Sequence, residues 1–351
     1  MSLRERFGWS PFFESQAARL GRRDLRFARI VEEQRGLYRI AGDAEGWAEV
    51  SGRFRHEAAN AADFPAVGDW VGVDGGIIHV RLERRGTVSR AAAGRAVDEQ
   101  VVAANVDVIF LVTALTQDLN TRRLERYLTM VWDAGAVPVV VLNKSDLCDD
   151  PAAACESVRA RLPMIDVLVV SALEDAGLDA LGPYLRPAQT VALLGSSGVG
   201  KSTLVNRLLG ADTLRVRAIS DADGKGRHTT TARQLVELPG GALLIDTPGM
   251  RELQPWADES AVAAAFDDIT SLAAACRFTD CAHSGEPGCA VREAVEARRL
   301  DPDRLENFQR LGREAAYEAR KHDKAAAAEH KRRWKQMHQA QKAMYRDRDR
   351  G

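Results

Sequence analysis

The chain has 351 residues, enough for two or three domains, and its 45% apolar and 28% charged residues are ordinary for a globular protein. No apolar run approaches the roughly 18 residues of a membrane-spanning helix, and no apolar segment of a secretion signal follows the basic start. The cysteines number five, an odd count that argues against a disulfide framework. We therefore expect a cytoplasmic protein that does not enter a membrane.

The formal net charge of −1 hides two basic ends. Residues 331–351 have eight basic and two acidic side chains, and residues 1–30 have seven basic and three acidic ones. The other 300 residues then have a net charge of −11. Such ends either bind nucleic acid or are solvated, and charge alone does not decide between the two. We expect basic tails at 1–24 and 331–351, the first of them poorly ordered.

Residues 25–95 are predicted to form a small, OB-like β-barrel. Five short strand-like runs follow one another here, at 26–31, 37–40, 47–54, 69–73 and 77–82. Gly75 and Gly76, between the last two runs, indicate a hairpin. Barrels of this kind often bind oligonucleotides on one face, but a barrel that only packs against a neighbouring domain has the same pattern.

From residue 96 to 258, apolar runs alternate with helix-like segments, which predicts an α/β domain with a parallel sheet. We expect strands at 106–112, 137–142, 167–170, 190–194 and 242–245. One helix is expected over 121–133. After residue 258 the strand signals stop, and helices are expected over 259–275 and 290–345.

A phosphate-binding loop is predicted after the run 190–194. Gly195-Ser196-Ser197-Gly198-Val199-Gly200-Lys201-Ser202 matches G-x-x-x-x-G-K-[ST], and the helix-like segment from Thr203 follows it. Backbone N–H groups of such a loop surround phosphate oxygens, Lys201 reaches the β and γ phosphates, and the Ser202 hydroxyl binds Mg²⁺. A chance glycine turn is the alternative, which the flanking strand and helix disfavour.

Two further segments predict that the base is guanine. Asn143-Lys144-Ser145-Asp146 ends the run 137–142, and Ser171-Ala172-Leu173 ends the run 167–170. The Asp146 carboxylate can accept from guanine N1–H and N2–H₂, which adenine does not have. Asn143 can bind the other edge of the base, the Lys144 stem can cover its face, and a backbone N–H of the second segment can reach O6. Together with the phosphate loop, these segments favour GTP over ATP.

The magnesium ion is expected near the end of the run 242–245. Asp246 in Asp246-Thr-Pro-Gly249 can hold Mg²⁺ through water, and the Gly249 N–H can contact the γ-phosphate. A threonine of the segment 229–231, either Thr230 or Thr231, is expected to close over the ion. Met250 stands where many GTPases have a glutamine, and it cannot orient a water molecule.

Cys276, Cys281, His283 and Cys289 predict a zinc site in a helical module over 259–330. Three thiolates and one imidazole suit tetrahedral Zn²⁺ with no open position, hence a structural ion. A redox pair is disfavoured because no C-x-x-C occurs. Cys148 and Cys155 lie outside the cluster and are interpreted as ordinary packing or surface thiols.

The guanine segments precede the phosphate loop, the reverse of the order in ordinary GTPases, which predicts a circularly permuted domain. With the barrel and the Cys/His cluster, the chain resembles the ribosome small-subunit-dependent GTPase A family (RsgA, also called YjeQ) over residues 25 to 330. The resemblance implies a monomeric GTPase that binds GTP, GDP and the small ribosomal subunit with its rRNA. It also implies a role in late assembly of that subunit, which stimulates hydrolysis.

The resemblance implies that His228 takes part in hydrolysis. The alternative is a loop histidine that contacts RNA or solvent. Three other functional alternatives stay open: a GTP-gated RNA-binding module with incidental hydrolysis, a partner-binding role of the basic C-terminal helix, and a permuted GTPase of the large subunit. The barrel and the cysteine cluster disfavour the last.

Overall fold

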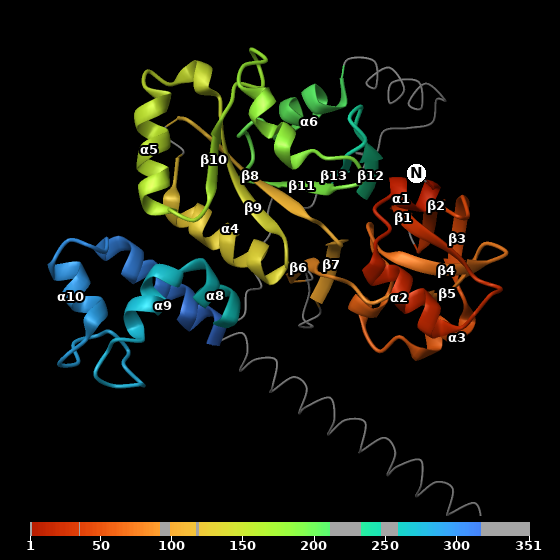
Figure 1. Cartoon of the computed structure of the whole chain (residues 1–351), viewed down its shortest axis with the longest axis horizontal. Helices are drawn as coiled ribbons and strands as arrows, with labels where there is room; N and C mark the ends of the chain where they lie inside the picture. Colours follow the sequence, from red (N-terminus) through yellow and green to blue (C-terminus); the bar gives the residue numbers. More distant parts are fainter. Residues whose placement is uncertain are drawn as a thin grey trace, which may run out of the picture. The chain divides into compact units, whose positions relative to one another are not determined.

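The computed structural model describes residues 2–34, 36–91, 99–116, 119–210, 233–246 and 259–316. It divides into two compact units (Figure 1). The first consists of residues 1–91 and 98–255, and the second of residues 92–97 and 256–351. The barrel and the α/β part belong to the first unit, and the Cys/His cluster belongs to the second.

A closed barrel forms in the first unit, as predicted, and five of the described strands build it. They are β1 (Arg26–Gln34), β2 (Leu37–Gly42), β3 (Gly46–Val50), β4 (Trp70–Asp74) and β5 (Ile77–Arg81). They pair in the order β1-β2-β3-β5-β4 and β4 returns to β1; only β3 and β5 run parallel. The strand predicted over 47–54 ends early, because Ser51 caps α3 (Gly52–Glu57) by accepting from the Phe54 N–H.

The expectation of a poorly ordered N-terminal tail is wrong for residues 3–20. They form α1 (Leu3–Arg6) and α2 (Pro11–Leu20). Aromatic side chains spaced among the charges are the reason: Phe13 is 1% exposed, and the Trp9 ring lies 4.7 Å from that of Trp70 on β4. The free energy gained by burying these rings is larger than the free energy that favours a solvated, arginine-rich tail.

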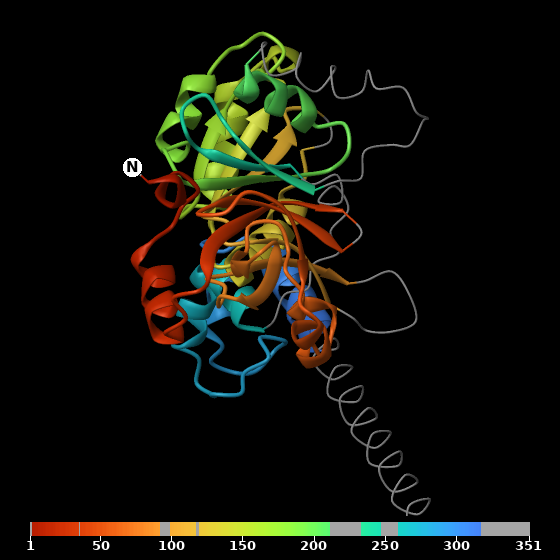
Figure 2. The ribbon, with the colours of Figure 1, turned by 90° about the vertical axis from the view of Figure 1, so that its right-hand side faces the viewer.

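The α/β part has a parallel sheet, as predicted, with helices on both sides of its strands (Figure 2). Its order is β10 (Asp166–Val169), β9 (Val137–Asn143), β8 (Val108–Ala114), β11 (Thr190–Leu194) and β13 (Leu243–Asp246). The helices are α4 (Thr121–Asp133), α5 (Pro151–Arg161) and α6 (Lys201–Leu209), with short helical turns η2 (Ser145–Leu147) and η3 (Leu178–Tyr184). A further short turn, η1 (Ala61–Asp63), belongs to the barrel part, between α3 and β4. β11 is an inner strand of this parallel sheet, between β8 and β13, so the loop after it lies along one sheet edge and not at its corner.

Three further strands were not predicted. β12 (Arg233–Glu237) runs antiparallel to β13 and also pairs with β1, so a single sheet continues from the α/β part into the barrel. β6 (Thr87–Ala91) and β7 (Glu99–Ala104) form a separate hairpin.

Arg29 on β1 joins the barrel to the α/β part. Its side chain donates to Phe7 O (2.7 Å), Thr190 Oγ1 (2.9 Å), Gly68 O (3.0 Å) and Asn105 O (3.1 Å). The residue is 1% exposed, and burial lowers the pKa of Arg29 to about 10, which leaves it charged at neutral pH. One buried cation therefore holds four segments of the chain together, and one of them is the beginning of β11.

The second unit is helical in its described part. It contains α8 (Glu259–Ala265), α9 (Asp267–Ala273), α10 (Ala290–Glu296) and a helical stretch over 302–316. Arg304 pairs with Asp268 at 2.7 Å and lies over the Phe266 ring, which ties the last stretch to α9. Within the described ranges, no helix combines the length and the apolar character needed to cross a bilayer.

Candidate functional site

The predicted phosphate loop connects β11 to α6 and depends on its glycines. Gly195, Gly198 and Gly200 have φ values of 152°, 82° and 95°, which disfavour any residue with a side chain. A Cβ atom on Gly195 would lie 2.1 Å from Val112 O, and one on Gly200 would lie 2.3 Å from Asn143 Nδ2. The loop can therefore approach the ends of β8 and β9 this closely only because Gly195 and Gly200 have no side chain.

Positive groups gather at this loop. The Lys201 ammonium donates to Gly195 O at 2.6 Å and to Ser196 O at 2.5 Å, so the side chain folds back over the loop. Lys201 also begins α6, whose first backbone N–H groups face the loop, and Ser202 and Thr203 are exposed in the first turn. A helix N-terminus beside a lysine favours the binding of phosphate.

Asn143 connects the three predicted nucleotide-binding segments. It ends β9 and is 1% exposed; its Nδ2 donates to Val199 O at 2.9 Å, and its Oδ1 accepts from the Ala172 N–H at 3.0 Å. The Ala172 N–H, one of the donors the sequence offered for guanine O6, thus binds Asn143 in this structure. The position of the phosphate loop relative to the base segments is set by this one amide.

Asp146 lies beside the same segments. Its Oδ1 accepts from the Ser171 hydroxyl at 2.5 Å, and the Ser171 oxygen in turn accepts from the Glu174 N–H at 3.1 Å. Asp146 is exposed, and Lys144 before it has a φ of 62°, which turns the chain sharply at the end of β9. An exposed carboxylate with a fixed orientation is suited to bind the N–H groups of a guanine.

Asp246 is the last residue of β13, the strand parallel to β11. The carboxyl ends of parallel neighbours meet at one sheet edge, so Asp246 lies on the same side as the phosphate loop. Predicted residues Gly249, Thr230, His228 and Met250 lie outside the described residues.

The structure brings the predicted cysteine and histidine ligands together. The ligand atoms of Cys276, Cys281, His283 and Cys289 all lie within 4.8 Å of one another. Cys276 Sγ is 3.9 Å from Cys289 Sγ, and His283 Nδ1 is 3.7 Å and 3.4 Å from these two sulfurs. Tetrahedral zinc with Zn–S bonds of about 2.3 Å would place two sulfurs about 3.8 Å apart. The cluster is therefore compatible with a four-coordinate structural metal ion.

Two side chains that the sequence analysis missed brace this cluster. The Glu286 carboxylate accepts from the N–H groups of Ser284 (2.7 Å), Gly285 (3.0 Å) and Ala282 (3.0 Å). Backbone N–H groups, first its own and those of Gly285 and Ser284, lower the pKa of Glu286 to about 2. Gln309 donates to the carbonyls of Ala282 and His283. Glu286 could have been found from the sequence, because it is an acidic residue between two of the predicted ligands. No local sequence pattern points to Gln309.

The Cys276 thiol lies at the start of α10. Burial alone would raise its pKa, but hydrogen bonds from the backbone N–H groups of Val291 and Ala290 lower the pKa of Cys276 below its ordinary value. Burial lowers the pKa of His283. Both shifts favour the deprotonated forms that bind metal ions.

Comparisons with known proteins agree with these features. A family model described as RsgA GTPase matches residues 81–256. A protein of Opitutus terrae named small ribosomal subunit biogenesis GTPase RsgA is 47% identical over 352 residues, 96% of each chain. The crystal structure of YjeQ from Thermotoga maritima is 25% identical, with a TM-score of 0.64, and the match covers 83% of this chain and 99% of that one. YloQ, described as a circularly permuted GTPase, is 25% identical with a TM-score of 0.60 over 84% of this chain and 96% of that one.

Proposed function

The chain belongs to the RsgA GTPase family and is a GTP-hydrolysing enzyme with a circularly permuted fold, and from this premise we propose that it acts in late assembly of the small ribosomal subunit. Its relative from Opitutus terrae is named for biogenesis of that subunit. The subunit stimulates hydrolysis. The assembly role rests on the identity of 47% to that relative. The observation that carries the GTP-binding part of the proposal is the Asn143 clamp, which joins the base segments and the phosphate loop into one site.

GTP binds in this site through groups at both ends. Asp146 recognises guanine N1–H and N2–H₂. Asn143 binds the other edge of the base, and the Lys144 stem covers its face. The loop from Gly195 to Gly200 surrounds the phosphates. The remaining contacts come from Ser145, Ser171, Ala172, Lys201, Ser202, Thr203 and Gly249. Support comes from the fixed orientation of the Asp146 carboxylate and from the fold of Lys201 over the loop.

Ser202, Thr230 and Asp246 hold the magnesium ion. Mg²⁺, when bound, offsets the negative charge on the β and γ phosphates. The position of Asp246 at the end of β13 supports its part in this assignment. Because Met250 cannot orient water, we assign this task to His228, which the small subunit brings into position.

One structural Zn²⁺ binds to Cys276, Cys281, His283 and Cys289. The distances between sulfur and nitrogen atoms support this identity, because Zn²⁺ prefers tetrahedral thiolate and imidazole ligands. His283 and the three cysteines leave no position for water, so the ion stabilises the module.

The protein acts as a cytoplasmic monomer whose barrel and basic residues 331–351 contact rRNA. The barrel type and the excess of basic residues in 331–351 support this proposal. A second candidate is a GTP-gated RNA-binding module in which hydrolysis is incidental; the same RNA contacts favour it.

GTP turnover with and without purified small subunits separates the two. We expect slow turnover by the free protein and acceleration of the order of 10³-fold by the subunits. His228→Ala should keep nucleotide and subunit binding but lose most of the acceleration. Equal turnover with and without subunits would favour the second candidate, and full acceleration of His228→Ala would remove the histidine from catalysis.

A further inference from the structure

One arginine reaches the second base segment from the helix that follows the phosphate loop. Arg207 lies in the last turn of α6, and its side chain is 44% exposed. Its Nε donates to Ala172 O at 3.0 Å, and its Nη2 donates to Leu173 O at 2.8 Å. Both carbonyls belong to the turn that follows β10, in one of the segments predicted to bind guanine. The arginine therefore holds two successive peptide groups of this turn.

The helix gives this arginine a fixed origin. Apolar residues of α6 are buried in the main core, namely Leu204, Val205 and Leu209. The two contacts come from one guanidinium, a planar group that binds two acceptors in a fixed geometry. The Asp175 carboxylate lies 4.0 Å from Arg207 Nε, which is too long for a hydrogen bond. The two backbone carbonyls are therefore the main partners of Arg207.

The N–H groups of this turn are used unequally. Three of them have partners in the structure, namely Ser171 N–H (Ala176 O, 2.9 Å), Ala172 N–H (Asn143 Oδ1, 3.0 Å) and Glu174 N–H (Ser171 Oγ, 3.1 Å). The Leu173 N–H has no acceptor among the described residues. Leu173 is 67% exposed, which leaves room for a ligand beside its backbone. Its N–H is therefore the donor of this turn that can bind guanine O6.

Arg207 acts on this N–H through the peptide group itself. Ala172 O and the Leu173 N–H belong to one trans peptide group, so they point in opposite directions. With the oxygen held by Arg207, the N–H faces away from the guanidinium. A charged donor on the oxygen also polarises the peptide group and makes its N–H a stronger donor. The next peptide group is held on both sides: its oxygen accepts from Arg207, and its N–H donates to the Ser171 hydroxyl.

We propose that Arg207 is a positioning residue for guanine recognition, which holds the Leu173 N–H where it donates to O6 of the base. The inference rests on the proposed function, in which the base segments bind GTP. An adenine has an amino group in place of O6, and this N–H donor disfavours it. The O6 contact is separable from the contacts of Asp146, because that carboxylate is oriented by the hydroxyl of Ser171, which is 1% exposed. Loss of the guanidinium should therefore weaken the O6 contact and spare the contacts to N1–H and N2–H₂.

The test compares two nucleotides that differ at one atom. 6-Thioguanosine diphosphate keeps the N1–H and N2–H₂ groups of GDP but has sulfur, a weak acceptor, in place of O6. Calorimetry on the wild type should show that GDP binds about tenfold more tightly than this analogue. Arg207→Ala should lower GDP affinity about fivefold and keep the affinity for the analogue within about twofold of the wild type. Arg207→Met keeps an apolar stem without the guanidinium and should behave as Arg207→Ala does.

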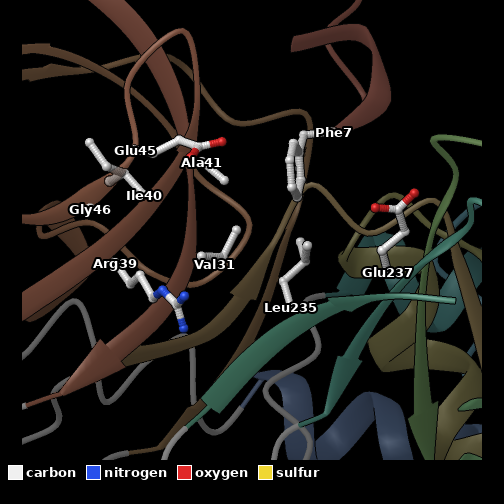
Figure 3. A pocket seen from close by; sticks show the side chains of 9 residues that line it. All are labelled: Phe7, Val31, Arg39, Ile40, Ala41, Glu45, Gly46, Leu235 and Glu237. Atoms are coloured by element: carbon white, nitrogen blue, oxygen red, sulfur yellow. The ribbon is translucent and has the colours of Figure 1, made fainter. Parts of the chain in front are cut away.

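Arg39→Ala is the matched control. Arg39 is also an exposed arginine of the first unit with one carboxylate nearby, that of Glu32 at 3.8 Å. It lines a groove between the barrel and β12 that contains no residue of the turn after β10 (Figure 3). Arg39→Ala should therefore bind both nucleotides as the wild type does.

Equal loss of affinity for GDP and for the analogue in Arg207→Ala would overturn the proposal, because a general disturbance of the fold does not select one atom of the base. A wild-type ratio of the two affinities in Arg207→Met would overturn it too, since the guanidinium would then have no part in the O6 contact. Asp146→Asn tests separately the site on which the inference rests. If this variant binds GDP as the wild type does, the base segments are not the guanine site, and the failure lies in the proposed function and not in Arg207 alone.

Discussion

The proposed phosphate loop and the Cys/His loop are both tight turns, but different forces position them. The first follows β11, whose Val191, Ala192 and Leu194 are at most 1% exposed. Its turn is fixed by glycine geometry and by the Asn143 amide. The second lies between α9 and α10, helices of seven residues each, with few fully buried neighbours such as Phe266 and Val291.

The two loops differ in whether ligand binding must also supply the free energy of folding. Strands buried on both faces contribute enough apolar area to preform the phosphate loop, so nucleotide binding needs little folding. A small helical module has too little apolar area for this, and metal binding then becomes part of its folding. We therefore expect substitutions at the loop held by a core and at the loop held by its ligand to have different effects.

Metal removal should have the largest effect. Cys281→Ala, or chelation, should unfold residues 259–316, because structural zinc sites contribute about 10–16 kcal/mol of apparent binding free energy. Hydrogen exchange should show lost protection there and unchanged protection of β8, β9 and β11. Cys148→Ala, outside the cluster, is the control and should behave as the wild type. A stable, metal-free second unit would show that its helices need no ion.

Arg29→Met should destabilise the first unit by about 3 kcal/mol. It removes a donor from three carbonyls and one hydroxyl, although Gly68 O keeps the Asn105 Nδ2 donor at 3.0 Å. Buried acceptors left without a partner each cost about 1–3 kcal/mol unless water reaches them. Thr190→Val removes one of these partners and should cost about 1 kcal/mol. Urea unfolding measures both. If the free energy of unfolding of Arg29→Met equals that of the wild type, the continuous sheet alone holds the barrel to the α/β part.

Gly200→Ala should lower GTP affinity between tenfold and a hundredfold. The new methyl group would lie 2.3 Å from Asn143 Nδ2, and the φ of 95° adds strain of about 1–3 kcal/mol. Titration calorimetry with GDP and a non-hydrolysable GTP analogue measures the loss. Gly182→Ala is the control, since a Cβ atom there meets no atom within 4 Å. Unchanged affinity in Gly200→Ala would contradict the role of the Asn143 clamp.

Glu286→Gln should have the smallest effect, a loss of metal affinity of about tenfold, because it weakens the brace without removing a ligand. Competition with a chromogenic chelator measures this, and Glu293→Gln on the exposed side of α10 serves as control. A pKa near 2 keeps the Glu286 carboxylate ionised at neutral pH, and its contribution is lost only as the pH falls from 4.5 toward 2. The difference between the two proteins should therefore be constant from about pH 5 to 8. Superimposable chelator curves would show that Glu286 does not brace the site.

Sequence patterns predicted the parts whose signals are local. Apolar runs located β8, β9, β10, β11 and β13, and periodicity located α4 over Thr121–Asp133. β12 was missed because Leu235 is its one buried residue, and its strand form depends on pairing with β13 and β1. The Asn143 clamp also escaped, since its partners Val199 and Ala172 are 56 and 29 residues away in the chain. The N-terminal helices were missed because the charges of residues 1–24 indicate a solvated tail, whereas burial of Trp9 and Phe13 depends on contact with Trp70, which is distant in the chain.

The most direct test of the contrast is GDP affinity in protein depleted of metal. If the core of the first unit positions the nucleotide site, metal-free protein should bind GDP within about twofold of the metal-loaded protein, as expected for independent sites. Calorimetry on the full chain, before and after chelation, gives both affinities. A tenfold or greater loss on metal removal would show that the nucleotide site depends on the second unit, and would contradict the account.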